Sequence, residues 1–161
     1  MNTQSEGDVL MFRWHDSLFQ QGASFTSGMD DFPRPPVSKA NIDLQSWMYF
    51  FTKFMVEVAH IYDEDGSRYI ASLELIKSNS KYFVNPVDRT YRDISKDEKF
   101  SPHFGYPNIL PIAFGIPTFG SDEYNATIKK IKEELDIDKG LTSISKNSAL
   151  YLSNRGIFAL I

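Results

Sequence analysis

The 161-residue chain contains no cysteine, which excludes disulfides, thiolate nucleophiles and cysteine-based metal sites. Its three histidines, His15, His60 and His103, stand singly, without the close spacing of a zinc motif, so we expect no metal site and no cofactor. Long apolar runs are also missing. The run at residues 9–12 is too short for a signal-peptide core, and no stretch approaches the roughly 20 residues of a membrane helix. We therefore expect this chain to carry no targeting signal and no membrane segment.

An excess of positive charge is absent as well. The chain has 17 Lys and Arg residues against 21 Asp and Glu residues, a formal net charge of −4, so we expect no nucleic-acid partner. Its length fits one domain, given roughly 150 residues per domain. The aromatic share of 14% is high, and such side chains either build a core or line an apolar or sugar-binding cleft.

Hydrophobic periodicity predicts an all-α fold. The segments with helical spacing of apolar side chains are residues 41–62, 67–78, 104–116 and 121–137. Asn41 and Ser121 are the predicted N-caps of the first and last of these helices. Residues 1–40 and 140–154 are predicted to be irregular, and residues 82–94 to form a loop or a small hairpin.

The densest group of reactive side chains lies in residues 26–34, which read Thr-Ser-Gly-Met-Asp-Asp-Phe-Pro-Arg. Two adjacent carboxylates, Asp30 and Asp31, follow a glycine, and Arg34 comes three residues after the second. Consecutive side chains on an irregular segment diverge, so one carboxylate can face a pocket as a general acid while the other anchors the loop. The alternative is a surface turn closed by an Asx hydrogen bond, and spacing alone favours it.

Several blocks in this order resemble the catalytic domain of glycoside hydrolase family 63, whose eukaryotic members include mannosyl-oligosaccharide glucosidases. The specific block is Thr-Ser-Gly-Met-Asp-Asp-Phe-Pro-Arg-Pro at residues 26–35, followed by Ile-Asp-Leu-Gln-Ser-Trp-Met at residues 42–48. The upstream pair Arg13-Trp14 also fits. Looser matches follow at residues 105–111, Gly-Tyr-Pro-Asn-Ile-Leu-Pro, and at residues 140–145, Gly-Leu-Thr-Ser-Ile-Ser.

This resemblance implies an (α/α)6 toroid and an inverting α-glucosidase that removes terminal glucose from an N-glycan precursor oligosaccharide in the lumen of the endoplasmic reticulum. By alignment of the motifs, Asp30 takes the place of the general acid. Asp31, Phe32 and Arg34 are the expected substrate-binding residues of the glucose pocket. Trp47 is a further candidate, although a Trp on so apolar a helix packs in a core more often than it faces a sugar.

The sequence also departs from the family pattern. An inverting mechanism needs a second carboxylate about 6.5–9.5 Å from the first, and the adjacent Asp30 and Asp31 cannot form such a pair. The family's base is a Glu in a later segment, whose motif is only faintly echoed at residues 154–158. The remaining candidates lie off the apolar helix stripe or in charged, solvated runs and offer no replacement: Glu57, Glu98, Glu123, Glu133 and Glu134. We therefore predict a piece of the catalytic domain that lacks the base.

The predicted organisation is a polar N-terminal segment at residues 1–12, a partial (α/α)6 catalytic domain at residues 13–154, and an apolar tail at residues 155–161. Two alternatives stay open: another (α/α)6 glycosidase, such as a trehalase-like enzyme, or a non-catalytic helical interaction module or degenerate fragment. A glycosylation sequon at Asn125 has meaning only if the chain enters the secretory pathway.

Overall fold

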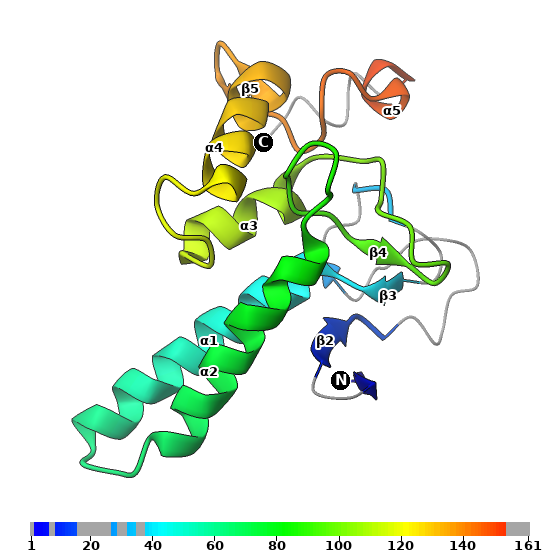
Figure 1. Ribbon diagram of the computed structural model, residues 1–161. Coiled ribbons are helices and arrows are strands. Elements are labelled where there is room, and N and C mark those ends of the chain that lie inside the picture. Colours follow the sequence, from blue (N-terminus) through cyan, green and yellow to red (C-terminus); the bar gives the residue numbers. More distant parts are fainter. Residues whose placement is uncertain (1, 7–8, 16–26, 29–31, 35–37, 154–161) are drawn as a thin grey trace.

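The computed structural model of the chain describes residues 2–6, 9–15, 27–28, 32–34 and 38–153 (Figure 1). This described part is mostly helical. Its α-helices are α1 (Ile42–Ile61), α2 (Ser67–Asn79), α3 (Tyr106–Phe114), α4 (Asp122–Lys130) and α5 (Ala149–Ser153). A 3-10 turn, η2 (Ser80–Phe83), follows α2, and a π-helical turn, η3 (Ile131–Leu135), continues α4. The short strands are β1 (Asn2–Glu6), β2 (Val9–Arg13), β3 (Ser38–Ala40), β4 (Ile94–Ser95), β5 (Asp136–Ile137) and β6 (Gly140–Leu141).

Helices α1 and α2 form an antiparallel pair that projects away from the rest of the molecule (Figure 1). Their bounds agree with the predicted helices to within two residues. Burial of α1 is concentrated in its first turns, where residues 42–46 are all buried. Further along, Phe51 and Phe54 are 54% and 55% exposed, because the projecting pair has no other described element beside this face.

Helices α3 and α4 also begin as the sequence predicts. The Ser121 hydroxyl accepts a hydrogen bond from the backbone N–H of Tyr124 and caps α4. The prediction of one regular helix as far as residue 137 is wrong, because α4 passes into the π turn η3 and the chain then pairs β5 with β6. The buried Leu135 marks the change, since its carbonyl accepts hydrogen bonds from both the backbone N–H and the hydroxyl of Thr142.

The strands correct the expectation of an all-α fold with irregular structure throughout residues 1–40. Strand β1 pairs antiparallel with β2, and β3 pairs antiparallel with β4, which lies more than fifty residues later in the chain. The predicted boundary between the polar N-terminal segment and the catalytic domain, after residue 12, falls inside β2. These strands are too short to show a clear alternation of apolar and polar side chains, so their pairing depends on contacts that sequence periodicity does not reveal.

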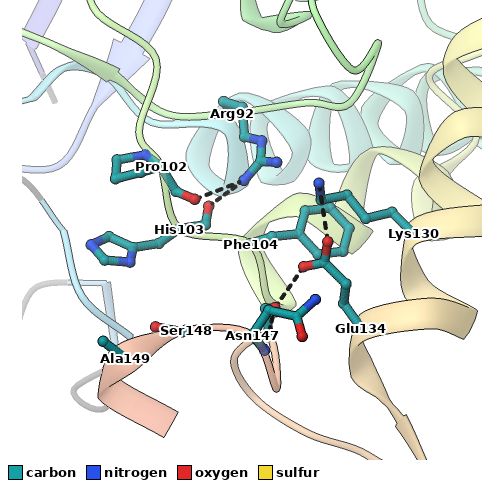
Figure 2. Close-up of a pocket in the computed structure, with 10 residues that line it drawn as sticks. Arg92, Pro102, His103, Phe104, Lys130, Glu134, Asn147, Ser148 and Ala149 are labelled. Carbon is teal, nitrogen blue, oxygen red and sulfur yellow. Dashed lines mark hydrogen bonds and ion pairs between the residues drawn. The ribbon is translucent and has the colours of Figure 1, made fainter. Parts of the chain in front are cut away.

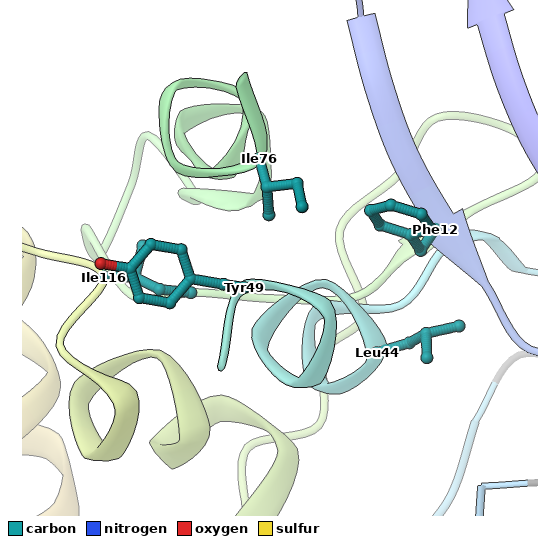
Figure 3. Close-up of a cluster of buried hydrophobic side chains, with 5 residues drawn as sticks. All are labelled: Phe12, Leu44, Tyr49, Ile76 and Ile116. Atoms are coloured by element: carbon teal, nitrogen blue, oxygen red, sulfur yellow. The ribbon is translucent and has the colours of Figure 1, made fainter. Parts of the chain in front are cut away.

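Two apolar clusters hold α1 in place. Phe12 of β2 packs with Leu44 and Tyr49 of α1, with Ile76 of α2 and with Ile116 after α3 (Figure 3). The second cluster is formed by Ala40, Ile42, Phe83, Tyr91 and Ile94. Both clusters include residues from the first turns of α1, and residues 42–46 of this helix are all buried. No helix within the described ranges is long and apolar enough to cross a membrane.

Candidate functional site

A buried ion network stands at the start of α1. The Arg34 guanidinium donates hydrogen bonds to both carboxylate oxygens of Asp43, at 3.0 and 2.5 Å, and to Oδ2 of Asp93, at 2.9 Å. The side chains of all three residues are at least 97% buried. Such charge-assisted bonds to a planar guanidinium fix direction as well as distance. Arg34 is therefore held rigidly by two carboxylates, one of them 59 residues further along the chain.

The network is also bonded to the backbone of α1 and to β2. Asp93 Oδ1 accepts the Ile42 backbone N–H at 2.8 Å, so this carboxylate satisfies a donor that the helix itself leaves open. The Trp14 indole N–H donates to Asp43 Oδ2 at 3.0 Å, and the Trp14 backbone N–H donates to the side-chain oxygen of Asn41 at 3.1 Å. Trp14, Arg34 and Asp43 come from three separate sequence blocks, and the fold joins them in one network.

Sequence reasoning missed Asp93, which belongs to none of the motifs. Its partners lie far away along the chain, and only the pairing of β3 with β4 brings it to α1. Burial raises the pKa of Asp93 to about 6, against the lowering effect of Arg34, while the neighbouring Asp43 adds to the rise. One guanidinium facing two carboxylates thus does not offset the cost of burying the Asp93 charge, and the pKa of Asp93 stays raised.

The raised pKa of Asp93 predicts a pH dependence of stability. Between about pH 4 and pH 6 the folded state holds a proton on Asp93 that the unfolded state has released. The free energy of unfolding contributed by this group therefore falls as the pH rises through that window. The variant Asp93→Asn is expected to lack this slope in urea unfolding curves measured from pH 4 to pH 7. If its slope equals that of the wild type while the exposed control Asp97→Asn also matches the wild type, the prediction is wrong.

A second set of contacts holds Phe32. Its buried ring packs against Ile144 and Tyr151 and lies against the backbone of Gly105. Gly105 and Ile144 face each other in an antiparallel bridge, flanked by hydrogen bonds from Tyr106 N–H to the Ser143 carbonyl and from Ser145 N–H to the Phe104 carbonyl, at 3.1 and 2.8 Å. The loosely matched blocks at residues 105–111 and 140–145 thus meet around the phenylalanine of the specific block.

The predicted site residues are placed as follows. Asp30 and Asp31 lie outside the described residues, between Gly28, whose φ of +69° suits glycine in a turn, and Phe32. Phe32 and Arg34 are buried among protein groups, one in each of the two sets of contacts. Both residues thus contact the protein interior on the same short stretch of chain. The substrate contacts expected of them stay predictions.

Trp47 lies apart from this loop, at the interface of α1 and α3. Its ring stacks on Phe51 with a centroid distance of 5.8 Å and meets Phe114 at 4.8 Å. The residue is half-buried among these rings. Packing against α3 is thus its observed surrounding, and contact with a sugar stays a prediction.

No group of three or more His, Asp or Glu side chains within the described part of the chain is arranged to hold a metal ion. The arrangement positions a short stretch of chain. Two sets of contacts, one through Arg34 and one through Phe32, hold residues 32–34, which follow the adjacent carboxylates in the sequence. We call them the Arg34 anchor and the Phe32 anchor.

Comparison with known proteins identifies the family. Residues 1–102 match the sequence model of the glycosyl hydrolase family 63 C-terminal domain. The chain is 28% identical over 152 residues to a probable mannosyl-oligosaccharide glucosidase of Schizosaccharomyces pombe (strain 972 / ATCC 24843), covering 87% of this chain and 19% of that protein. It thus spans about a fifth of the length of this curated relative. A solved sialidase chain is similar in fold, with a TM-score of 0.72 at 18% identity over 88% of this chain and 13% of its own. The chain belongs to glycosyl hydrolase family 63, as its match to the C-terminal domain shows.

Proposed function

We propose that this chain provides the general-acid part of an inverting α-glucosidase that removes terminal glucose from an N-glycan precursor oligosaccharide. Family membership supports the reaction class, and the name of the S. pombe relative supports the substrate class. The proposed location, the lumen of the endoplasmic reticulum, is what the family resemblance implies. The observation that carries the proposal is the pair of anchors. Phe32 and Arg34 are both buried in the protein interior, one and three residues after the second carboxylate.

In this mechanism Asp30, protonated, donates its proton to the glycosidic oxygen as the bond from that oxygen to the sugar breaks. A water molecule, deprotonated by a second carboxylate on the other face of the sugar, attacks the anomeric carbon and inverts it. Asp31 is too close in sequence to be that base, so it serves the glucose pocket. We place the base in a part of the family's catalytic domain outside this chain, consistent with the coverage of about a fifth of the S. pombe relative.

The exposed aromatic face of α1 supports a place in a larger helical domain. Phe50, Phe51 and Phe54 are each at least 40% exposed, and the rings of Phe50 and Phe114 stack at 4.8 Å. In an (α/α)6 toroid each helix pair packs against neighbouring pairs, which would cover such a face. The second candidate, a non-catalytic helical interaction module, draws on the same face, because an aromatic patch of this kind also suits a partner protein.

Transplantation into the relative tests the catalytic role. In a chimera, this chain replaces the matched stretch of the S. pombe protein, and glucose release from a glucosylated oligosaccharide is measured. We expect the chimera to be active, and Asp30→Asn to lower kcat about 10²- to 10⁴-fold, because an amide cannot supply the proton.

The matched control is Asp122→Asn, which changes an exposed carboxylate in the first turn of α4 and is expected to leave glucose release unchanged. Full activity of the Asp30→Asn chimera would remove Asp30 from the acid role. A correctly folded chimera without any activity would favour the interaction module instead.

A further inference from the structure

A solvent-accessible cavity of about 370 Å³ is lined by residues next to the Gly105–Ile144 bridge, and of these only Ser145 belongs to one of the sequence blocks described above. Figure 2 shows its walls: His103 on one side, Lys130 and Glu134 on the other, and the turn with Asn147 and Ser148 between them. Its volume falls in the range of small-molecule sites. Phe104 and Ser145, which line it, adjoin Gly105 and Ile144 directly in sequence. The cavity therefore neighbours the Phe32 anchor.

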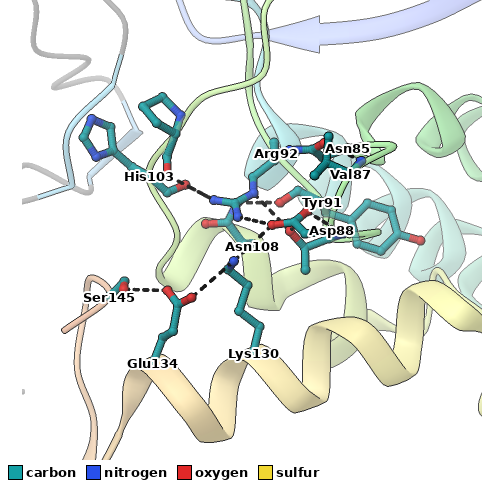
Figure 4. A network of polar contacts seen from close by, with 12 residues as sticks. Asn85, Val87, Asp88, Tyr91, Arg92, His103, Asn108, Lys130, Glu134 and Ser145 are labelled. Atoms are coloured by element: carbon teal, nitrogen blue, oxygen red, sulfur yellow. Dashed lines mark hydrogen bonds and ion pairs between the residues drawn. The ribbon is translucent and has the colours of Figure 1, made fainter. Parts of the chain in front are cut away.

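The cations of the cavity wall, Arg92 and Lys130, are paired with carboxylates, one of which, Asp88, lies outside the wall itself (Figure 4). Arg92 and Lys130 donate to the same oxygen of Asp88, at 2.7 and 3.0 Å, and Lys130 also pairs with Glu134 at 3.2 Å. Although burial acts to raise the pKa of Asp88, the hydrogen bonds from Arg92, Thr90 and Lys130 hold it well below its usual range. Two cations thus face two carboxylates, which leaves no surplus positive charge for an anionic ligand.

Several polar groups nevertheless keep hydrogen-bonding capacity. The His103 ring, the Asn147 amide and the Ser148 hydroxyl proton make no side-chain donor bond to any residue that the structure describes. Burial, and secondarily Arg92, lowers the pKa of His103, so its neutral ring offers one donor and one acceptor. Glu134 accepts from the Ser145 hydroxyl at 2.5 Å and retains lone pairs on both oxygens.

The backbone of one cavity wall has an unusual conformation, the π turn η3. Lys130 and Glu134 stand four residues apart across the start of η3, and π turns of this kind are frequent at functional sites. The apolar part of the wall comes from Pro102, Phe104 and Ala149. A mixture of donors, acceptors and apolar surface, with its cations already paired, matches a ring that carries several hydroxyl groups, each both donor and acceptor.

We propose that this cavity is a carbohydrate subsite that holds one neutral hexopyranose unit of the oligosaccharide, with hydrogen bonds from His103, Glu134 and Asn147. The inference rests on the proposed function, because it assigns a further sugar unit of the same substrate to this chain. It places that unit beside the Phe32 anchor, so a sugar bound there would help to align the glycan with the loop that carries Asp30.

The test uses the 161-residue chain, labelled with ¹⁵N, and NMR titration with methyl α-D-glucopyranoside and with methyl α-D-mannopyranoside. We expect at least one of the two glycosides to shift the amide signals of residues 103–105 and 145–149 in a saturable way. His103→Ala and Asn147→Ala should each weaken the apparent Kd about three- to tenfold, as expected for the loss of one hydrogen bond. The controls His60→Ala and Asn125→Ala, both at exposed positions, should bind as the wild type does.

Three outcomes overturn the subsite: neither glycoside binds, binding is unchanged by both cavity substitutions, or inorganic phosphate shifts the same signals while the glycosides do not. The titration involves no hydrolysis, so its failure is distinct from failure of the proposed function. An inactive chimera together with saturable glycoside binding would refute the glucosidase and keep the subsite. An active chimera with no glycoside binding in the labelled chain would support the glucosidase and refute the subsite.

Discussion

Arg34→Met is expected to lower the free energy of unfolding by about 3–5 kcal/mol, because it leaves two buried carboxylates without their cation. Asp43 and Asp93 lose three hydrogen bonds from the guanidinium in a setting where water cannot replace them. Urea unfolding at pH 7, followed by circular dichroism, measures the effect. In the chimera the same change should also reduce glucose release, since the loop after Asp31 loses one of its anchors.

The control for Arg34 is the exposed ion pair of Lys39 and Glu98, whose members also join β3 to the turn after β4. Lys39→Met should change the free energy of unfolding by no more than about 1 kcal/mol, because solvent screens that pair. A second comparison isolates the cause. Adding Asp93→Asn to Arg34→Met removes one of the two stranded charges and should restore part of the lost stability. If the double variant is no more stable than Arg34→Met, the loss does not come from unpaired charge.

What the sequence could predict here was local. Helical periodicity depends on neighbours three and four residues away, so α1, α2 and the Ser121 cap were predicted close to their observed bounds. The block at residues 26–35 stood out because glycine, adjacent carboxylates and an arginine are unusual together, and its Phe32 and Arg34 are buried in the structure. The family assignment from these blocks is confirmed by the match over residues 1–102.

What the sequence could not predict depends on pairing between distant segments. Asp93 stands 59 residues from Arg34, and nothing in its neighbours marks it as the second partner of that guanidinium. Glu134 was placed in a charged, solvated run, yet its side chain is 81% buried and lines a cavity together with Ser145 and Lys130. A run of charged residues on a helix predicts an exposed face, and only the structure reveals a distant segment that packs against it.

Gly105→Ala is the other change with a large expected effect. The backbone of Gly105 is extended, with φ of 179°, so the residue is not glycine for conformational reasons. Space is the reason: an added Cβ would lie 2.1 Å from the Ser143 carbonyl oxygen and 2.7 Å from the nearest ring carbon of Phe32. One methyl group must therefore open the Gly105–Ile144 bridge or displace Phe32. We expect a loss of about 3 kcal/mol in the free energy of unfolding, at the upper end for overpacked cores.

Gly66→Ala is the matched control, because a Cβ there would meet only the Ala59 side chain at an ordinary 3.4 Å, and the backbone φ of −84° suits alanine. Its free energy of unfolding should change by less than about 1 kcal/mol. The decisive comparison is then between stability and activity in the chimera. Phe32 follows Asp31 directly, so Gly105→Ala should lower kcat under conditions where the variant is still fully folded. A folded Gly105→Ala chimera with unchanged kcat would show that the Phe32 anchor supports the fold but does not position the acid.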